Sequence, residues 1–407
     1  MALFVARQPI LNRNREVDGY ELLFRSSAVN AFDGTDGNQA TSRVVANGLF
    51  AVGLENILSD KRAFINFTRD LLLDDLASVL SPETTVIEIL ETVEPDIAVV
   101  EACQKLKSQG YTLALDDFVC HERFEPLTRM ADIIKVDFRS TDAAQQESLV
   151  LQFGRRGIKM LAEKVETQEE FDYARRIGYV LFQGYFFAKP AILSGREVPG
   201  HKLHYLQVLK LVHNPTLDFI KLERLIKQDV SLSYKLLRYI NTARFGCRQS
   251  IESIKHALVL LGEAEIRRWA SLAILSGMCE DKPKELLLSA IIRARFCELV
   301  AHAAGLRARE SDLFLTGMFS FLDAIMDLPL EEVLSKINVH DDVRRILLRT
   351  GPVVKQMAAV YDGVRAYESA AWQTLSPLVG QLRVEEDTLP ELYLQAVHWS
   401  QEIFRQK

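Results

Sequence analysis

The chain has 407 residues, enough for roughly two or three domains with their own cores. With 48% hydrophobic and 26% charged residues, the composition is that of a soluble globular protein. The net charge of −6 gives no basic surface and argues against a nucleic acid polymer as a partner. No apolar run approaches ~18 residues without a charge, and the first residues lack the cationic start of a signal peptide. We therefore expect a cytoplasmic protein that does not bind a membrane.

Short apolar strands alternate with amphipathic helical stretches through the first half of the chain. The first two strands, residues 3–11 and 17–24, are joined by a polar turn and predict an antiparallel hairpin. Six more strands are expected at 63–67, 85–91, 112–118, 133–138, 158–163 and 180–187, with helices at 39–58, from about 70, and at 95–108, 142–155 and 167–177. Eight strands, most of them separated by helices, predict a (β/α)8 TIM-like barrel with an antiparallel first strand, over residues 1–195.

One of these apolar strands ends in two adjacent carboxylates, Asp116 and Asp117. Neighbouring acids at the end of a buried strand repel each other unless a cation lies between them, and a divalent metal is the simplest such cation. Two acids alone are also typical of the start of a helix, so the other strands decide between these interpretations.

Polar residues interrupt seven of the predicted strands. They are Glu21, Asn66, Glu88, Asp116, Asp117, Lys135, Asp137, Glu163 and Gln183. Any one of them could be a buried polar group with a hydrogen-bond partner, but together they predict a ring of oxygen ligands at one mouth of the barrel. Oxygen ligands without Cys or His favour Mg²⁺ or Mn²⁺. Several acids and one Lys fit a two-metal site that splits a phosphodiester, and Lys135 and Asp137, two residues apart on one strand, are expected to pair.

These motifs resemble the EAL family of cyclic-di-GMP phosphodiesterases. The signature at the second strand is GYELLFR, residues 19–25, with Leu22 in place of the name-giving Ala, and residues 183–190 also match. The resemblance implies that the metal ligands are Glu21, Asn66, Glu88, Asp116, Asp117 and Glu163. It implies that the catalytic residues are Lys135, which orients the attacking water, with Glu21 and Glu163. It further implies substrate contacts by Gln8, Arg25, Asp137 and Gln183, and support of the loop after the Asp pair by Glu91.

Two segments depart from the family pattern. The loop at 119–127 is shorter than in active members and has no glycine, and Val119 cannot readily adopt a positive φ. Lys164 stands where the family has Gly, which puts a cation beside the second metal position. Two hypotheses follow. The barrel hydrolyses cyclic-di-GMP to linear pGpG through a two-metal site, or it is a catalytically degenerate receptor or scaffold that binds the nucleotide without turnover. The complete ligand set favours the enzyme.

After a linker at 196–202, apolar residues recur at helical spacing and predict an all-α domain over residues 203–407. Residues 236–246 and 254–262 resemble the HDOD output domain, a relative of HD phosphohydrolases. Ser320 and Phe321 replace the His-Asp metal pair of those enzymes, and His340 in the only His-Asp dipeptide is expected to cap a helix. The resemblance implies that this domain binds an unidentified protein partner, and a homodimer is the other assembly considered.

Overall fold

The computed structural model describes residues 3–26, 58, 60–74, 76–189, 200–242 and 251–405. The chain forms two compact units: Met1–Lys189 together with Asp362–Lys407, and Pro190–Tyr361. The last part of the predicted helical domain thus groups with the barrel, and most of the predicted linker at 196–202 lies outside the described residues. None of the described helices is both long and apolar enough to cross a membrane.

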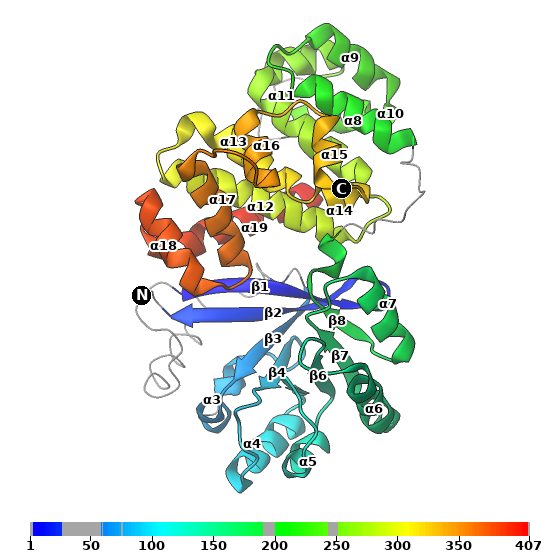
Figure 1. Ribbon diagram of the computed structural model, residues 1–407, viewed down its shortest axis with the longest axis vertical. Coiled ribbons are helices and arrows are strands. Elements are labelled where there is room, and N and C mark those ends of the chain that lie inside the picture. The colour runs from blue at the N-terminus through cyan, green and yellow to red at the C-terminus, as the bar shows by residue number, and fades with distance from the viewer. Residues whose placement is uncertain are drawn as a thin grey trace. The chain divides into compact units, whose positions relative to one another are not determined.

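The first unit contains a closed barrel of eight strands in chain order (Figure 1). Strand β1 (Leu3–Asn12) pairs antiparallel with β2 (Val17–Ser26) and with β8 (Leu181–Gln183). The strands between them, which run parallel, are β3 (Arg62–Phe67), β4 (Thr85–Ile89), β5 (Thr112–Leu115), β6 (Ile133–Asp137) and β7 (Lys159–Glu163). The predicted barrel with an antiparallel first strand is confirmed.

Helices follow most of the strands. They are α3 (Arg69–Leu73), α4 (Ile97–Ser108), α5 (Glu125–Thr128), α6 (Ala143–Phe153) and α7 (Gln168–Ile177). Asp142 and Thr167 begin α6 and α7 with capping boxes, in which the cap side chain and the third helical residue satisfy each other's backbone amides. These local signals explain why the sequence located both helices. The predicted helix at 39–58 lies, apart from Leu58, outside the described residues.

The end of the chain covers an edge of the barrel. Strand β8 pairs with β1 only at Ile10–Asn12, so on this side β1 continues toward Leu3 without a strand partner among the described residues. There the Tyr367 hydroxyl, in α17 (Lys355–Glu368), donates to the Val5 carbonyl at 3.3 Å and accepts from the Val5 amide at 3.4 Å. Further contacts come from α18 (Trp372–Leu382), whose Trp372 ring lies 5.9 Å from that of Phe4, and the chain ends with α19 (Leu389–Arg405). An edge strand is protected in this way from pairing with another chain.

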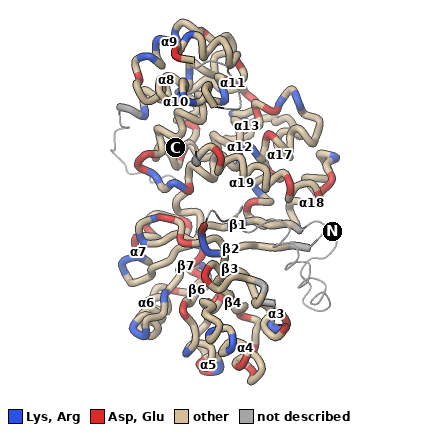
Figure 2. The backbone as a smooth tube through the Cα atoms, turned by 180° about the vertical axis from the view of Figure 1, so that it is seen from behind, with Lys and Arg blue, Asp and Glu red and all other residues tan. Residues whose placement is uncertain are grey.

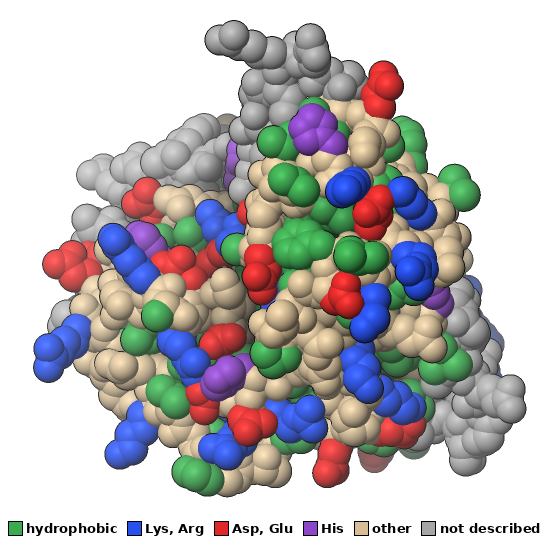
Figure 3. Space-filling view, turned by 90° about the horizontal axis from the view of Figure 1, so that it is seen from above, with side chains coloured by type: hydrophobic (Ala, Val, Ile, Leu, Met, Phe, Trp, Pro, Cys, Tyr) green, Lys and Arg blue, Asp and Glu red, His purple; other side chains and the backbone are tan. Residues whose placement is uncertain are grey.

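The described elements of the second unit are all helical. They are α8 (Gly200–Val212), α9 (Phe219–Gln228), α10 (Val230–Ile240), α11 (Ile254–Met278), α12 (Lys284–Ala303), α13 (Glu310–Phe319), α14 (Leu322–Met326), α15 (Leu330–Ser335) and α16 (Asp341–Leu348). The predicted cap is confirmed, because His340 Nδ1 accepts from the Asp342 amide at the start of α16. Figure 3 shows basic and acidic side chains interspersed on one face of the molecule.

Candidate active site

The site lies one layer above the apolar centre of the barrel. In β3 to β8, the residue two positions after a core residue is polar, and alternate residues of a strand share a face. These pairs are Phe64 and Asn66, Val86 and Glu88, Ala114 and Asp116, Ile133 and Lys135, Leu161 and Glu163, and Leu181 and Gln183. The polar members therefore project into the carboxyl end of the barrel, and Figure 2 shows the charged positions on the strands.

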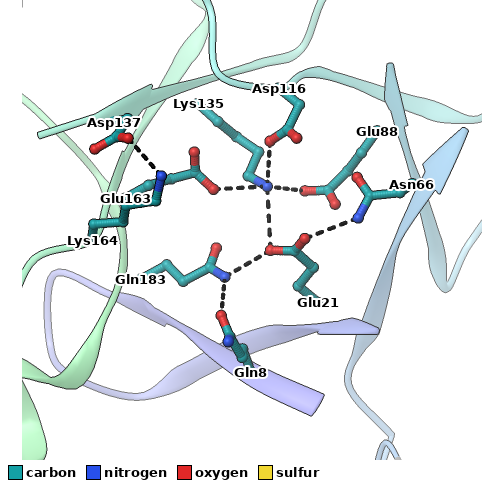
Figure 4. Close-up of polar contacts among 10 residues, drawn as sticks. All are labelled: Gln8, Glu21, Asn66, Glu88, Asp116, Lys135, Asp137, Glu163, Lys164 and Gln183. Carbon is teal, nitrogen blue, oxygen red and sulfur yellow. Dashed lines mark hydrogen bonds and ion pairs between the residues drawn. The ribbon is translucent and has the colours of Figure 1, made fainter. Parts of the chain in front are cut away.

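Lys135 lies at the centre of four carboxylates (Figure 4). Its Nζ atom is 2.7 Å from Asp116 Oδ1, 2.8 Å from Glu88 Oε1, 2.9 Å from Glu163 Oε1 and 3.3 Å from Glu21 Oε2. The lysine side chain is only 1% exposed. We call these four residues the inner acids. Their convergence is the arrangement that the strand pattern predicted.

Side-chain amides complete the ring. Glu21 Oε1 accepts from Asn66 Nδ2 at 3.0 Å, and Glu21 Oε2 accepts from Gln183 Nε2 at 2.7 Å. The same Gln183 nitrogen donates to Gln8 Oε1 at 3.0 Å. Four predicted site residues on β1, β2, β3 and β8 are thereby connected, and the orientation of Glu21 is fixed from both sides.

One ammonium cannot neutralise four buried carboxylates. Burial raises the pKa of Glu88 well above its usual value and that of Glu163 to about 8, and it also raises the pKa of Asp116. Burial opposes ionisation of Glu21 as well, but Lys135 and the two amides outweigh it and lower the pKa of Glu21. The inner acids outweigh burial at Lys135 and raise its pKa, so the lysine stays charged. The centre is therefore short of positive charge.

The donor set fits a hard divalent cation. Asn66 Oδ1, Glu88 Oε2 and Asp117 Oδ1 are buried and accept no hydrogen bond within the described part of the chain. Buried oxygens without donors, in a pocket of carboxylates, are the ligands that Mg²⁺ and Mn²⁺ prefer. With the Lys135 ammonium at the centre, no three described acids are arranged as a metal ligand set. A divalent ion at this centre would therefore compete with the Lys135 ammonium for the inner acids.

The predicted pairing of Lys135 with Asp137 is wrong. Asp137 is the last residue of β6, and its carboxylate accepts from Lys164 Nζ at 2.6 Å and from the Arg139 amide at 2.6 Å. Two residues along a strand span about 6.6 Å, so the two side chains share a face but lie at different depths. In the sequence, Lys164 was marked as a site residue only because it stands where the family has Gly.

The remaining predicted residues lie at the rim. Arg25 is in β2 opposite Phe4, and its side chain is outside the described residues. Glu91 is exposed in the turn after β4, so its predicted support of the following loop stays a prediction. An ion pair connects that loop to the segment after β4, because Arg123 Nη1 lies 3.0 Å from Glu94 Oε1. The sequence did not predict this contact.

The backbone after β5 turns at Asp117, which has φ 39°. The turn therefore does not require a positive φ at Val119. The Phe118 amide then donates to the Lys135 carbonyl at 3.0 Å, which anchors the start of the loop to β6. In this glycine-free loop, the residue with the left-handed backbone is Asp117.

Comparisons with known proteins identify the family of this chain. The EAL domain family matches residues 48–190, and the HDOD domain family matches residues 199–337. Cyclic di-GMP phosphodiesterase CdgJ of Vibrio cholerae is 38% identical, over 99% of this chain and 93% of that protein. The chain belongs to the EAL–HDOD family. Another relative, uncharacterized protein YuxH of Bacillus subtilis, is 37% identical over 98% of both chains.

Among solved structures, a standalone EAL protein of Vibrio cholerae O395 in its c-di-GMP bound form is similar to the EAL part. It is 26% identical, covers 46% of this chain and 91% of its own, and superposes with a TM-score of 0.38. The Klebsiella pneumoniae protein BlrP1, in complex with manganese and cyclic-di-GMP, is also 26% identical. It covers 46% of this EAL–HDOD chain and 55% of its own, with a TM-score of 0.38.

Proposed function

We propose that this EAL–HDOD protein hydrolyses cyclic-di-GMP to linear pGpG. The observation that carries the proposal is the ring of inner acids around Lys135, in a chain similar over nearly its whole length to a named cyclic-di-GMP phosphodiesterase. Water adds to one phosphorus atom, one P–O ester bond breaks, and the leaving oxygen takes up a proton. The second phosphodiester stays intact, so the product is a linear dinucleotide.

The roles of the residues follow from their positions. A bound Mg²⁺ or Mn²⁺ ion would polarise the phosphodiester and lower the pKa of its water. Its proposed ligands are Glu21, Asn66, Glu88, Asp116, Asp117 and Glu163. Once displaced from the centre, the Lys135 ammonium orients the attacking water and offsets the negative charge that develops on the phosphate. Gln8, Arg25, Asp137 and Gln183 are proposed to contact the substrate.

The test uses the full chain, stripped of metal with EDTA and incubated with cyclic-di-GMP and Mg²⁺ or Mn²⁺. Products are separated by chromatography, and nucleotide binding is measured in parallel. Metal-dependent formation of pGpG is expected. Binding without product in either metal would contradict the proposal and favour the receptor, whereas absence of both would contradict enzyme and receptor alike.

We also propose that the HDOD part binds a protein partner and has no metal chemistry. Arg293 Nη1 donates to Ser320 Oγ at 2.9 Å, and its guanidinium lies 4.1 Å from the centre of the Phe321 ring. A cation at the position of the missing His-Asp pair disfavours a divalent metal. The double variant Ser320→His with Phe321→Asp is therefore expected to leave the metal content of the full chain unchanged, as measured by elemental analysis. Additional bound metal would show that the HD site is latent.

A further inference from the structure

A second pair of carboxylates lies at the end of the strands, above the inner acids. Asp117 is the second residue after β5, and Asp137 is the last residue of β6. We call these two residues the outer acids. The Asp137 side chain is only 9% exposed. Asp117 Oδ1 is buried and accepts no hydrogen bond from the residues that the structure describes. Two largely enclosed carboxylates at one mouth require a nearby positive charge.

Lys164 supplies that charge. It directly follows β7, and its Nζ atom lies 2.6 Å from Asp137 Oδ2. Figure 4 shows the Lys164 ammonium directed to Asp137 and separate from the centre that Lys135 occupies. Among the described residues, the mouth therefore contains one ammonium at the inner acids and another at Asp137.

The backbone at Lys164 is strained. Its φ is 55°, in the left-handed region that a residue with a Cβ atom adopts only at a cost. Glycine would adopt this conformation without that cost, but it would bring no ammonium. Asp117, the second residue after β5, also has a positive φ, of 39°. Strained residues that carry charge at the open end of a barrel are typical of a functional constraint.

We propose that Lys164 is a built-in cation that takes the place of the second divalent ion, so that the barrel binds one Mg²⁺ or Mn²⁺ ion, held by the inner acids, Asn66 and Asp117. The inference rests on the proposed function for the existence of that ion. An ammonium held 2.6 Å from Asp137 Oδ2, directly after the proposed ligand Glu163, repels a second divalent ion at this end of the strands. The two-metal site that the sequence predicted is thus replaced by one metal and one lysine.

The test counts bound Mn²⁺ in the full chain without nucleotide, by equilibrium dialysis and by electron paramagnetic resonance. We expect one Mn²⁺ per chain for the parent and two for Lys164→Gly, which removes the ammonium and relieves the backbone strain. Lys164→Met removes only the charge and is also expected to bind two. The spectra of the two variants should show the line broadening of neighbouring Mn²⁺ ions.

Lys189→Met is the matched control, because this lysine pairs with Glu166 at 2.8 Å, away from both groups of acids. It is expected to bind one Mn²⁺ as the parent does. Two ions in the parent, or one ion in both folded Lys164 variants, would overturn the inference. Cyclic-di-GMP hydrolysis is measured separately, so a parent that binds two Mn²⁺ and forms pGpG would refute the role of Lys164 and leave the proposed function intact.

Discussion

Lys135 is the residue whose replacement separates catalysis from binding. Its ammonium is the central counter-charge of the inner acids. Lys135→Ala should lower turnover of cyclic-di-GMP by roughly 10²–10⁴-fold, because the attacking water loses its orienting group. Mn²⁺ affinity should be kept or increased, since a competing cation is removed. Steady-state kinetics and Mn²⁺ titration measure the two effects.

Glu21→Ala is the matched comparison for that variant. It removes a proposed ligand and should weaken Mn²⁺ binding itself, because Glu21 is oriented by Asn66 and Gln183. Both variants must first show the parent's circular dichroism spectrum. Parental turnover by folded Lys135→Ala would make the lysine a structural residue.

Glu163 gives the metal-free protein a distinct pH dependence. Burial raises its pKa from 4.5 to about 8 in the folded chain. Between these values the folded protein holds a proton that the unfolded chain lacks, so the free energy of unfolding should fall as the pH rises through this window. Thermal unfolding in EDTA and in Mg²⁺, at about pH 5.5 and about pH 8.5, should show a larger gain from metal at the higher pH.

The Glu163→Gln variant is the control for this pH effect. It is neutral at every pH, as the protonated acid is, so its Tm in EDTA should depend less on pH than that of the parent. An equal pH dependence in parent and variant would assign the effect to another group.

At the scale of elements, Gly184 fixes how β8 ends beside the loop after β7. Its φ is 142°, and a Cβ atom there would lie 2.0 Å from the Val165 carbonyl oxygen. Gly184→Ala should therefore lower the free energy of unfolding by about 2–4 kcal/mol, as measured by urea denaturation. It should also reduce activity, because the neighbouring Gln183 holds Glu21.

Gly157→Ala is the matched control for the clash. Gly157 has φ 83°, but nothing lies within 4 Å of its would-be Cβ atom. This variant should lose only about 1–2 kcal/mol, the cost of the left-handed backbone alone. Equal losses for the two variants would show that the contact with Val165 is not the cause.

The sequence predicted elements where a local signal exists. Short apolar runs located the strands, and the polar residues that interrupt those runs located the ring of acids. The last strand was predicted to run to residue 187 but ends at Gln183, because Gly184 turns the chain into a 3-10 helix at Tyr185–Ala188. The residues before and after Gly184 are similarly apolar, so the composition of this segment does not show where the strand ends. Which ammonium pairs with which acid depends on depth in the barrel, and strand periodicity does not encode that depth.

At the scale of the molecule, Tyr367 joins the end of the chain to the first strand. Its fully buried hydroxyl exchanges two hydrogen bonds with Val5, and its ring packs 5.4 Å from Trp372. Tyr367→Phe keeps the ring but leaves the Val5 amide and carbonyl without this partner. The free energy of unfolding should fall by about 1–3 kcal/mol.

Tyr173→Phe is the matched control for that loss. The Tyr173 hydroxyl donates to the Ala143 carbonyl at 3.3 Å but lies in an exposed environment. Water can replace this bond, so urea denaturation should show a change within about 0.5 kcal/mol. A Tyr367→Phe variant as stable as Tyr173→Phe would show that the edge of β1 does not depend on the tyrosine.

The sequence could not reveal this contact. Helical periodicity in residues 355–405 predicts that each helix has an apolar face, but it does not say what the face covers. The EAL match ends at residue 190 and the HDOD match at residue 337, so neither match includes the segment that contacts β1. Contacts between the two ends of a chain leave no local pattern.

The contact between Val5 and Tyr367 has a consequence for biosynthesis. A ribosome makes β1 before Tyr367, and the whole of Pro190–Tyr361 is synthesised between them. The eight strands can therefore associate early, but the edge of β1 stays uncovered until Tyr367 has emerged from the ribosome. During that interval the nascent chain exposes a strand edge that could pair with a neighbouring chain on the same messenger RNA.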